Sequence, residues 1–504
     1  MARLIFRYAY LLAATLVLCY ATINRPGLHT TSRSKQPEKQ PKFRSTVTSE
    51  TCIQVEYDGD DMNVFNVPSR PKQQQDWPGL LAQTLQVKGH WDDRARYKHF
   101  PDAFLANHLL SLSKYETCMA THGTVEAAGQ VVRAARNWPG AISLAVFAPA
   151  SDFLMTVVFI RHLRKCFPSV RDQVTWHLSY PRDMPPSLKN AHLLQLDFPC
   201  SMTTTEVLTK LRDTVDAKDT AEVRQIVYPQ NSMRNLARRH CRNEWVVCPD
   251  LDMVFPDPSE GASPFALLNR FLGGPMAADL CREKKCAFVL PLYEVENVRG
   301  EGRVPPDKDT LLQMVRKGHA QIYHLQVFDG NQGRSNLTAW EQLPPVSEVQ
   351  VAFRVNFSFL YEPVYIAKHG SPDFEERFLG YGMTRNTQVL EMHLSGYEFY
   401  LLDSIFLSHL WGILKKKNYN HARFQQIVFN SRLFHTFFMR ELAFRHQQDL
   451  STLVSTPTGL KPMFRTNINV ETCLHKPSTN NAQNKSYFVN KNAKIEFRST
   501  INNK

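Results

Sequence analysis

Apolar runs alternate with amphipathic stretches between residues 115 and 250. Short runs rich in aliphatic and aromatic residues predict buried strands, and longer stretches with apolar residues at helical spacing predict helices. In chain order these are a strand within "YETCMATHGT", a strand at 141–149, a helix at 152–167, a strand at 174–180, a helix at 232–241 and a strand at 244–250. This alternation indicates a parallel α/β sheet, which binds its ligands beyond the carboxyl ends of the strands.

The pattern continues toward the C-terminus. Runs at 286–295 and 364–370 predict further strands, and the segment 424–450 predicts a long helix whose phenylalanines belong to the core. We therefore expect a globular domain at 111–475. It is followed at 476–504 by a polar tail rich in Asn, Lys and Ser, a composition typical of disorder.

Residues 8–23 form an uncharged, mostly apolar segment. The segment is somewhat shorter than the roughly 20 residues that cross a bilayer comfortably. One interpretation is a retained transmembrane signal anchor, with a cytoplasmic tail at 1–7 and a lumenal stem at 24–110; the other is a secretory signal peptide cut near Ala21. Basic residues flank the segment on both sides and do not decide its orientation. We favour the anchor, which makes the protein membrane-anchored.

Composition and charge limit the classes of function that the protein can have. The chain has 504 residues, 43% of them hydrophobic, which is enough for a sizeable core. The net charge of +13 is not concentrated in a recognition helix or in zinc-finger spacing, which argues against a nucleic acid partner. Three glycosylation sequons, at Asn336, Asn356 and Asn484, fit a secretory route.

The cysteines also bear on compartment. Ten are present, and nine remain when Cys19 of the apolar segment is set aside. An odd number implies at least one free or intermolecular thiol. Cys281 and Cys286 close the loop "CREKKC" and are predicted to form a local disulfide.

Two aspartates, Asp250 and Asp252, follow the apolar run Trp245 to Cys248. In extended backbone, side chains one residue apart point to the same side. Two such carboxylates offer hard oxygen ligands for Mg²⁺ or Mn²⁺. An Asx turn before Pro256 explains the same residues equally well.

A second motif favours the metal interpretation. In "FLSHLWGILKKK", His409, Gly412 and Lys415 have the spacing H-x-x-G-x-x-K, which offers an imidazole, a close backbone approach and a cation. These groups suit a metal diphosphate, and mixed oxygen and imidazole ligation favours Mn²⁺ over Mg²⁺. Between the two motifs, Gly380-Tyr-Gly382 predicts a tight turn, and a helix-like stretch carrying Glu391 follows it.

The runs "SMRNLARRHCRNEWVVCPDLDMVFP" and "FEERFLGYGMTRNTQVLEMHLSGYEF", with the closing "FLSH", resemble the β-1,4-glucuronyltransferase 1 group of glycosyltransferases, kin to the second catalytic domain of the LARGE enzymes. Similarity also covers "THGTVEAAGQVVRAARNWPGAISLAVFAP", so it spans about residues 115 to 415. The resemblance implies an α/β domain of the GT-A fold that binds a nucleotide sugar. It also implies a single-pass type II Golgi membrane protein with a lumenal catalytic domain.

The resemblance implies roles for individual residues as well. Asp250 and Asp252 would bind the divalent metal, usually Mn²⁺, and the donor diphosphate, and His409 would complete the metal site. Four further residues would contact the uridine diphosphate or lie near the nucleotide: Arg234, Asn235, Thr121 and His122.

The reaction implied by the group is transfer of glucuronic acid from UDP-glucuronate to a β-linked xylose on an O-mannosyl glycan of a glycoprotein, priming matriglycan. Such a transfer inverts the anomeric centre and needs a general base on the acceptor hydroxyl. Glu391 is our first candidate and Glu376 our second. Alternatives are transfer of another UDP-sugar such as N-acetylglucosamine, or a catalytically weak glycan-binding subunit. A complex with other Golgi glycosyltransferases is a further expectation.

Overall fold

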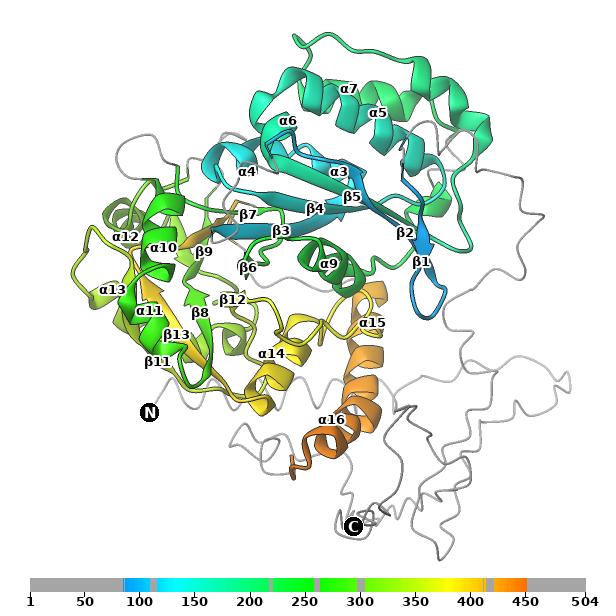
Figure 1. Ribbon diagram of the computed structural model, residues 1–504. Coiled ribbons are helices and arrows are strands. Elements are labelled where there is room, and N and C mark those ends of the chain that lie inside the picture. The colour runs from blue at the N-terminus through cyan, green and yellow to red at the C-terminus, as the bar shows by residue number, and fades with distance from the viewer. Residues whose placement is uncertain are drawn as a thin grey trace, which may run out of the picture. The chain divides into compact units, whose positions relative to one another are not determined.

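The computed structural model describes residues 85, 87–108, 116–216, 221–257, 263–296, 304–410, 412–413 and 421–450 (Figure 1). All of them lie within one compact unit, Pro68–Asn467. The tail, anchor and most of the stem expected at the N-terminus, the polar C-terminal tail and Lys415 lie outside these ranges. Within these ranges no helix is both long enough and apolar enough to cross a membrane.

Four parallel strands form the part of the sheet that the sequence predicted. In spatial order they are β5 (Val174–Pro181), β4 (Ile142–Phe147), β3 (Thr117–Thr124) and β6 (Trp245–Val247). The predicted helices are α5 (Ser151–Cys166) and α9 (Gln230–Arg239). They lie on opposite faces of these strands (Figure 1), so the strands are buried on both sides, as is usual for a parallel sheet. The predicted parallel α/β core is confirmed.

The sheet extends beyond this core to ten strands. Next to β6 lies the antiparallel strand β12 (Val364–Lys368), then β8 (Lys285–Leu290), β13 (Tyr397–Asp403) and β11 (Gln350–Val355). The apolar run at 286–295, predicted as one strand, divides at Pro291, because proline cannot donate a ladder hydrogen bond. Its second half, β9 (Leu292–Val295), joins a smaller sheet in the order β10 (Ala320–Ile322), β9, β14 (Leu407–His409), β7 (Met253–Val254).

The predicted stem boundary at residue 110 is wrong. Strand β2 (Tyr97–Phe104) pairs antiparallel with β5, and the two-residue β1 (His90–Trp91) pairs with β2 at the sheet edge. The segment "YKHFPDAF" carries a proline and several polar residues, so it lacks the apolar run of a central strand. An irregular register between Phe100 and Phe104 accommodates it, as is common at sheet edges.

Further helices connect the strands along the chain. In chain order they are α3 (Val125–Ala128), α4 (Val131–Asn137), α6 (Pro168–Gln173), η2 (Leu188–Gln195), α7 (Thr204–Asp213), α10 (Pro264–Leu272), α11 (Pro275–Leu280), α12 (Lys308–Lys317), η4 (Asp329–Asn331), η5 (Gly333–Ser335), α13 (Leu337–Gln342) and α14 (Arg385–Leu394).

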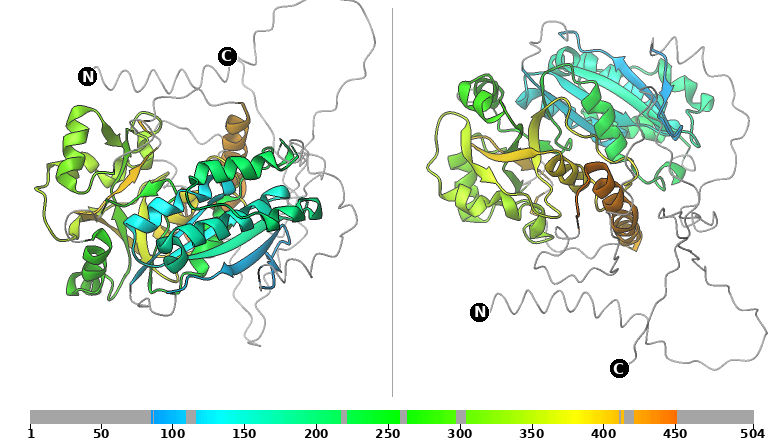
Figure 2. Two further views of the ribbon diagram at one scale, coloured as in Figure 1. Left: turned by 90° about the horizontal axis from the view of Figure 1, so that it is seen from above. Right: turned by 60° about the horizontal axis from the view of Figure 1, so that its bottom comes forward.

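The predicted C-terminal helix is present in three consecutive parts: α15 (His421–Leu433), a π-helical turn (Phe434–Phe438) and α16 (Met439–His446). It lies beside α14 in all views (Figure 2). Its phenylalanines divide between core and surface, because Phe434 and Phe438 are buried whereas Phe424, Phe429 and Phe444 are exposed. The prediction that all belong to the core is therefore only half right.

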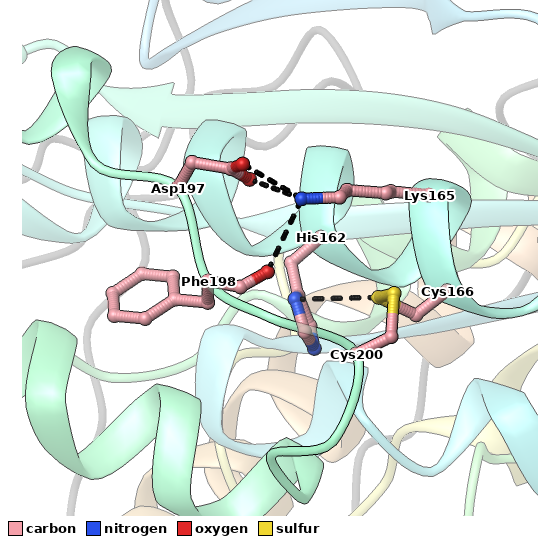
Figure 3. The surroundings of a disulfide bond; sticks show 6 residues. All are labelled: His162, Lys165, Cys166, Asp197, Phe198 and Cys200. Carbon is pink, nitrogen blue, oxygen red and sulfur yellow. Dashed lines mark hydrogen bonds and ion pairs between the residues drawn. A yellow bond between two sulfur atoms is a disulfide. The ribbon is translucent and has the colours of Figure 1, made fainter.

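Three disulfides connect the described residues. The predicted local bridge Cys281–Cys286 is present, together with Cys118–Cys241 and Cys166–Cys200. The last of these joins the end of α5 to the segment before α7, beside an ion pair between Lys165 and Asp197 (Figure 3). Cys248 is a buried free thiol, while Cys52 and Cys473 lie outside the described residues.

Removing the Cys118–Cys241 bridge is expected to cost more stability than removing Cys281–Cys286. The first closes a loop of 123 residues and the second a loop of 5. If loop-closure entropy of the unfolded chain dominates, these bridges contribute about 5 and about 2 kcal/mol respectively. Urea unfolding of the two double cysteine-to-alanine variants, followed by tryptophan fluorescence, measures the difference. Equal losses would contradict the expectation.

Candidate functional site

Asp250 lies just beyond the carboxyl end of β6 and accepts three hydrogen bonds at one oxygen. Its Oδ1 atom is 2.9 Å from Arg234 Nη2, 2.8 Å from Arg385 Nη2 and 3.2 Å from His122 Nε2. Burial by itself would raise the pKa of Asp250, but the positive charges of Arg234 and Arg385 outweigh this and hold the pKa well below its usual range. Asp250 is therefore ionised and fixed in orientation.

The backbone around the two aspartates forms a turn. The N–H of Met253 donates to the carbonyl of Asp250 at 2.9 Å. The extended backbone that we expected to direct both carboxylates to one side is therefore absent. The Asx-turn interpretation agrees with this backbone, and the two carboxylates have different partners: Asp250 contacts Arg234 and Arg385, whereas Asp252 faces His409.

Asp252 faces His409. The distance between Asp252 Oδ2 and His409 Nε2 is 3.4 Å. The smaller sheet brings them together, because β14 pairs with β7 and sets His409 opposite Met253, the residue after Asp252. The ring edge of His409 also lies near Tyr323, with 5.2 Å between ring centroids.

The metal expectation can be tested against these contacts. Across the part of the chain that the structure describes, no three His, Cys, Asp or Glu side chains gather closely enough to hold a metal by themselves. Asp252 and His409 supply one oxygen and one nitrogen atom that lie 3.4 Å apart. This pair fits a cation that takes its other ligands from phosphate oxygens and water, a common arrangement for Mg²⁺ and Mn²⁺.

His122, predicted near a nucleotide, lies at the end of β3. Because Asp250 can only accept, His122 Nε2 carries the proton, and its Nδ1 accepts from the Tyr228 hydroxyl at 2.8 Å. Burial lowers the pKa of His122, so it is neutral near pH 7. Thr121 is fully buried, and as the adjacent strand residue it points to the opposite face of the sheet.

Arg385, to which no sequence motif assigned a role, connects α14 to the end of β6. It is the first residue of α14, and its guanidinium also donates to the carbonyl of Cys248 at 2.8 Å. Arg234 donates to Asn231 on its own helix, α9. The two arginines therefore hold α9, α14 and the end of β6 around Asp250. The usable signal was a charged residue just after the glycine turn.

Asn235, the neighbour of Arg234, binds protein backbone. Its side chain donates to the carbonyl of Phe374 and accepts from the N–H of the same residue, at 2.8 and 2.9 Å. It also donates to Glu376 Oε1 at 2.8 Å. Asn235 thus anchors the segment that leads into the glycine turn.

The predicted glycine turn is present and firmly held. Gly380 and Gly382 have φ angles of 67° and 88°, which favour glycine. The side chain of Asn430 on α15 donates to the carbonyls of Leu379, Tyr381 and Gly382 at 2.8 to 2.9 Å. Gly412 has a φ angle of 83°, a left-handed conformation that favours glycine.

The two expected bases lie in different surroundings. The carboxylate of Glu391 forms an ion pair with Arg445 of α16 and lies 3.9 Å from His446 Nε2. Glu376 accepts from Asn235 and lies 3.8 Å from Arg96 Nη2. The structure therefore directs Glu391 toward the C-terminal helix and Glu376 toward α9.

Glu362, which no sequence motif marks, lies two residues before β12. Because β12 runs antiparallel to β6, with Ile366 opposite Val247, the residues before β12 run beside those that follow β6. Burial raises the pKa of Glu362 to about 7, against the opposing positive charges of Arg385 and Arg234. Glu362 is therefore a partly protonated acid beside Asp250 near neutral pH.

The fold is mixed α/β, with a fixed acid at the carboxyl end of a central strand and an acid and imidazole pair beside it. Residues 116–447 match the family described as "Glycosyl-transferase for dystroglycan". The match covers more than half of the chain, and the protein belongs to this family.

Curated relatives agree with the family. The chain is 30% identical over 297 residues to β-1,4-glucuronyltransferase 1 of Homo sapiens, covering 58% of this chain and 68% of that protein. It is 24% identical over 367 residues to the protein of the same name from Danio rerio, covering 70% and 81%. The xylosyl- and glucuronyltransferase LARGE1 of Homo sapiens is 23% identical over 183 residues, 36% of this chain and 22% of that protein.

Proposed function

We propose that this enzyme is a metal-dependent, inverting glycosyltransferase of the GT-A fold that transfers glucuronic acid from UDP-glucuronate to a glycan ending in β-xylose, as in matriglycan priming. The observation that carries the proposal is the Asp252 and His409 pair beside an Asp250 fixed by two arginines. Ligands of open α/β sheets bind at this edge. The relation to human β-1,4-glucuronyltransferase 1 supports glucuronic acid as the transferred sugar.

Mn²⁺ is the proposed cofactor. Asp252 Oδ2 and His409 Nε2 are the protein atoms that would hold it. When bound, the ion would supply positive charge that stabilises the departing diphosphate. The mixed oxygen and nitrogen donor set supports Mn²⁺ over Mg²⁺.

Three side chains of the protein fix the charge and the position of Asp250. Arg234 and Arg385 keep Asp250 ionised, and neutral His122 donates a third hydrogen bond to the same oxygen. About 31% of the Asp250 side chain stays exposed, so it can accept hydrogen bonds from hydroxyls of the nucleotide sugar. A donor held by such fixed groups loses little further freedom on reaction.

UDP-glucuronate is expected to be the preferred donor. UDP release with Mn²⁺ would be measured for UDP-glucuronate, UDP-xylose, UDP-glucose and UDP-N-acetylglucosamine, with and without a β-xyloside acceptor. Acceptor-dependent release from UDP-glucuronate supports the proposal. Preference for UDP-N-acetylglucosamine would show that the donor is a different UDP-sugar. UDP binding without any turnover would indicate a glycan-binding subunit and not an active enzyme.

We also propose that the domain lies in the Golgi lumen, as a type II membrane protein. Three disulfides support an oxidising secretory compartment, because cytosolic thiols are kept reduced. Asn336 and Asn356 are exposed, as acceptors of N-linked glycans must be.

Both asparagines are expected to carry N-linked glycans in secretory cells. Treatment with peptide N-glycosidase F should increase the electrophoretic mobility of the protein. The single variants Asn336→Gln and Asn356→Gln should each remove one step of the shift. If the tryptic peptides that contain Asn336 and Asn356 are both found without a glycan, the proposed location in the Golgi lumen is contradicted.

A further inference from the structure

An inverting transfer needs a group that removes the acceptor proton, and the site holds several acids with other partners. Asp250 accepts from two arginines and a histidine, and Asp252 faces His409. Glu391 pairs with Arg445, and Glu376 accepts from Asn235. A general base works best when its pKa is near the operating pH and its position is fixed.

Glu362 has a fixed position at the site. Its N–H donates to the carbonyl of Asn331, and its carbonyl accepts from Gln332 Nε2, both at 3.0 Å. Its carboxylate accepts from the N–H of Asn386, the second residue of α14. The register of β12 against β6 sets this segment beside the turn that carries Asp250 and Asp252.

The charges around Glu362 come from α14, α9 and the turn after β6. Arg385 of α14 and Arg234 of α9 favour its ionised form, whereas burial and the charge of Asp250 oppose it. Tyr323, which follows β10, responds to the charges of Asp250, Asp252 and Glu362 together. The Tyr323 ring lies 5.2 Å from that of His409, so Tyr323 links the surroundings of Glu362 to those of the Asp252 and His409 pair.

We propose that Glu362 is the general base of the transfer. The acceptor hydroxyl oxygen attacks the anomeric carbon of the donor sugar and forms the new C–O bond, while its proton passes to the Glu362 carboxylate. The bond between the anomeric carbon and the diphosphate oxygen breaks, and its electron pair leaves with UDP. This assignment rests on the proposed function and adds the proton acceptor to it.

The variant Glu362→Gln tests the assignment. Glutamine keeps an oxygen that can accept the Asn386 N–H but cannot take up a proton. We expect kcat for transfer to fall at least a hundredfold, the lower end of the effect of a general base. Binding of UDP with Mn²⁺, measured by calorimetry, and the Tm should stay unchanged. Glu348→Gln, an exposed glutamate paired with Arg270, is the matched control and should keep full activity.

The pH profile supplies a readout that a purely structural role would not move. The pKa of Glu362 is raised to about 7, so the carboxylate is lost as pH falls below that value. At pH values well below this pKa, wild-type kcat should therefore fall about tenfold for each unit of pH. Glu362→Asp should keep a titrating limb at reduced rate, and Glu362→Gln should show a flat profile.

Three results would overturn the assignment. Glu362→Gln could keep activity within a few-fold of wild type, it could lose UDP binding or Tm together with activity, or Glu391→Gln or Glu376→Gln could show the loss and the flat profile in its place. The proposed function fails separately, because in that case the wild-type enzyme itself would turn over no UDP-sugar.

Discussion

Asp252→Asn is expected to lower kcat/KM for glycosyl transfer at least a thousandfold while leaving the fold intact. The asparagine keeps the shape of the side chain but removes the negative charge that faces His409. A thousandfold loss corresponds to about 4 kcal/mol of transition-state stabilisation, which is in the range expected for a group that holds a catalytic cation. Steady-state UDP release with saturating Mn²⁺ measures the effect.

Removal of the metal by a chelator tests the same assignment independently. EDTA should abolish transfer by the wild-type enzyme, and excess Mn²⁺ should restore it. Far-ultraviolet circular dichroism and the Tm of Asp252→Asn should match those of the wild type. Near wild-type turnover by the variant, or turnover that EDTA does not change, would show that Asp252 does not hold a catalytic cation.

Asp250→Asn is expected to abolish transfer and also to destabilise the fold. It removes the anion that compensates two guanidinium groups whose side chains are only 6% and 7% exposed. Removing one partner of a buried ion pair costs about 3 to 5 kcal/mol, and the partial exposure of Asp250 places our expectation at the lower end of that range. Urea unfolding should therefore separate the two aspartate variants, with only Asp250→Asn losing stability.

A double-mutant cycle shows whether this cost comes from uncompensated charge. Arg385→Gln in the Asp250→Asn background removes one of the two guanidiniums left without a carboxylate. The double variant should be more stable than the sum of the two single effects predicts. Simple additivity would show that the destabilisation arises from another contact.

The elements that the sequence predicted well are those whose signal is local. The strands β4 and β6 are almost entirely apolar because both of their faces are buried, and helix α5 has apolar residues at helical spacing. The bridge Cys281–Cys286 was predictable because it closes a loop of only 5 residues. The position of Asp250 at a strand end followed from the same runs.

The features that escaped prediction depend on distant partners. The strands β1, β7, β10 and β14 have only two or three residues each, so tertiary pairing defines them. Glu391 was chosen because it follows the glycine turn, but five residues of helix lie between it and Arg385, and its carboxylate pairs with Arg445 of α16. Glu362 acquires its position from the register of β12, which no local motif announces.

The smaller sheet also constrains when activity can arise during synthesis. Its strand β7 ends at Val254, whereas β14, which carries His409, begins at Leu407. The pair that we expect to hold the cation therefore joins segments about 150 residues apart in the chain. Contacts of such long range require that the intervening chain be organised first. A nascent chain that ends before Leu407 contains both aspartates and the complete parallel core but lacks the histidine, so catalytic competence should be among the last properties that this enzyme acquires as it folds.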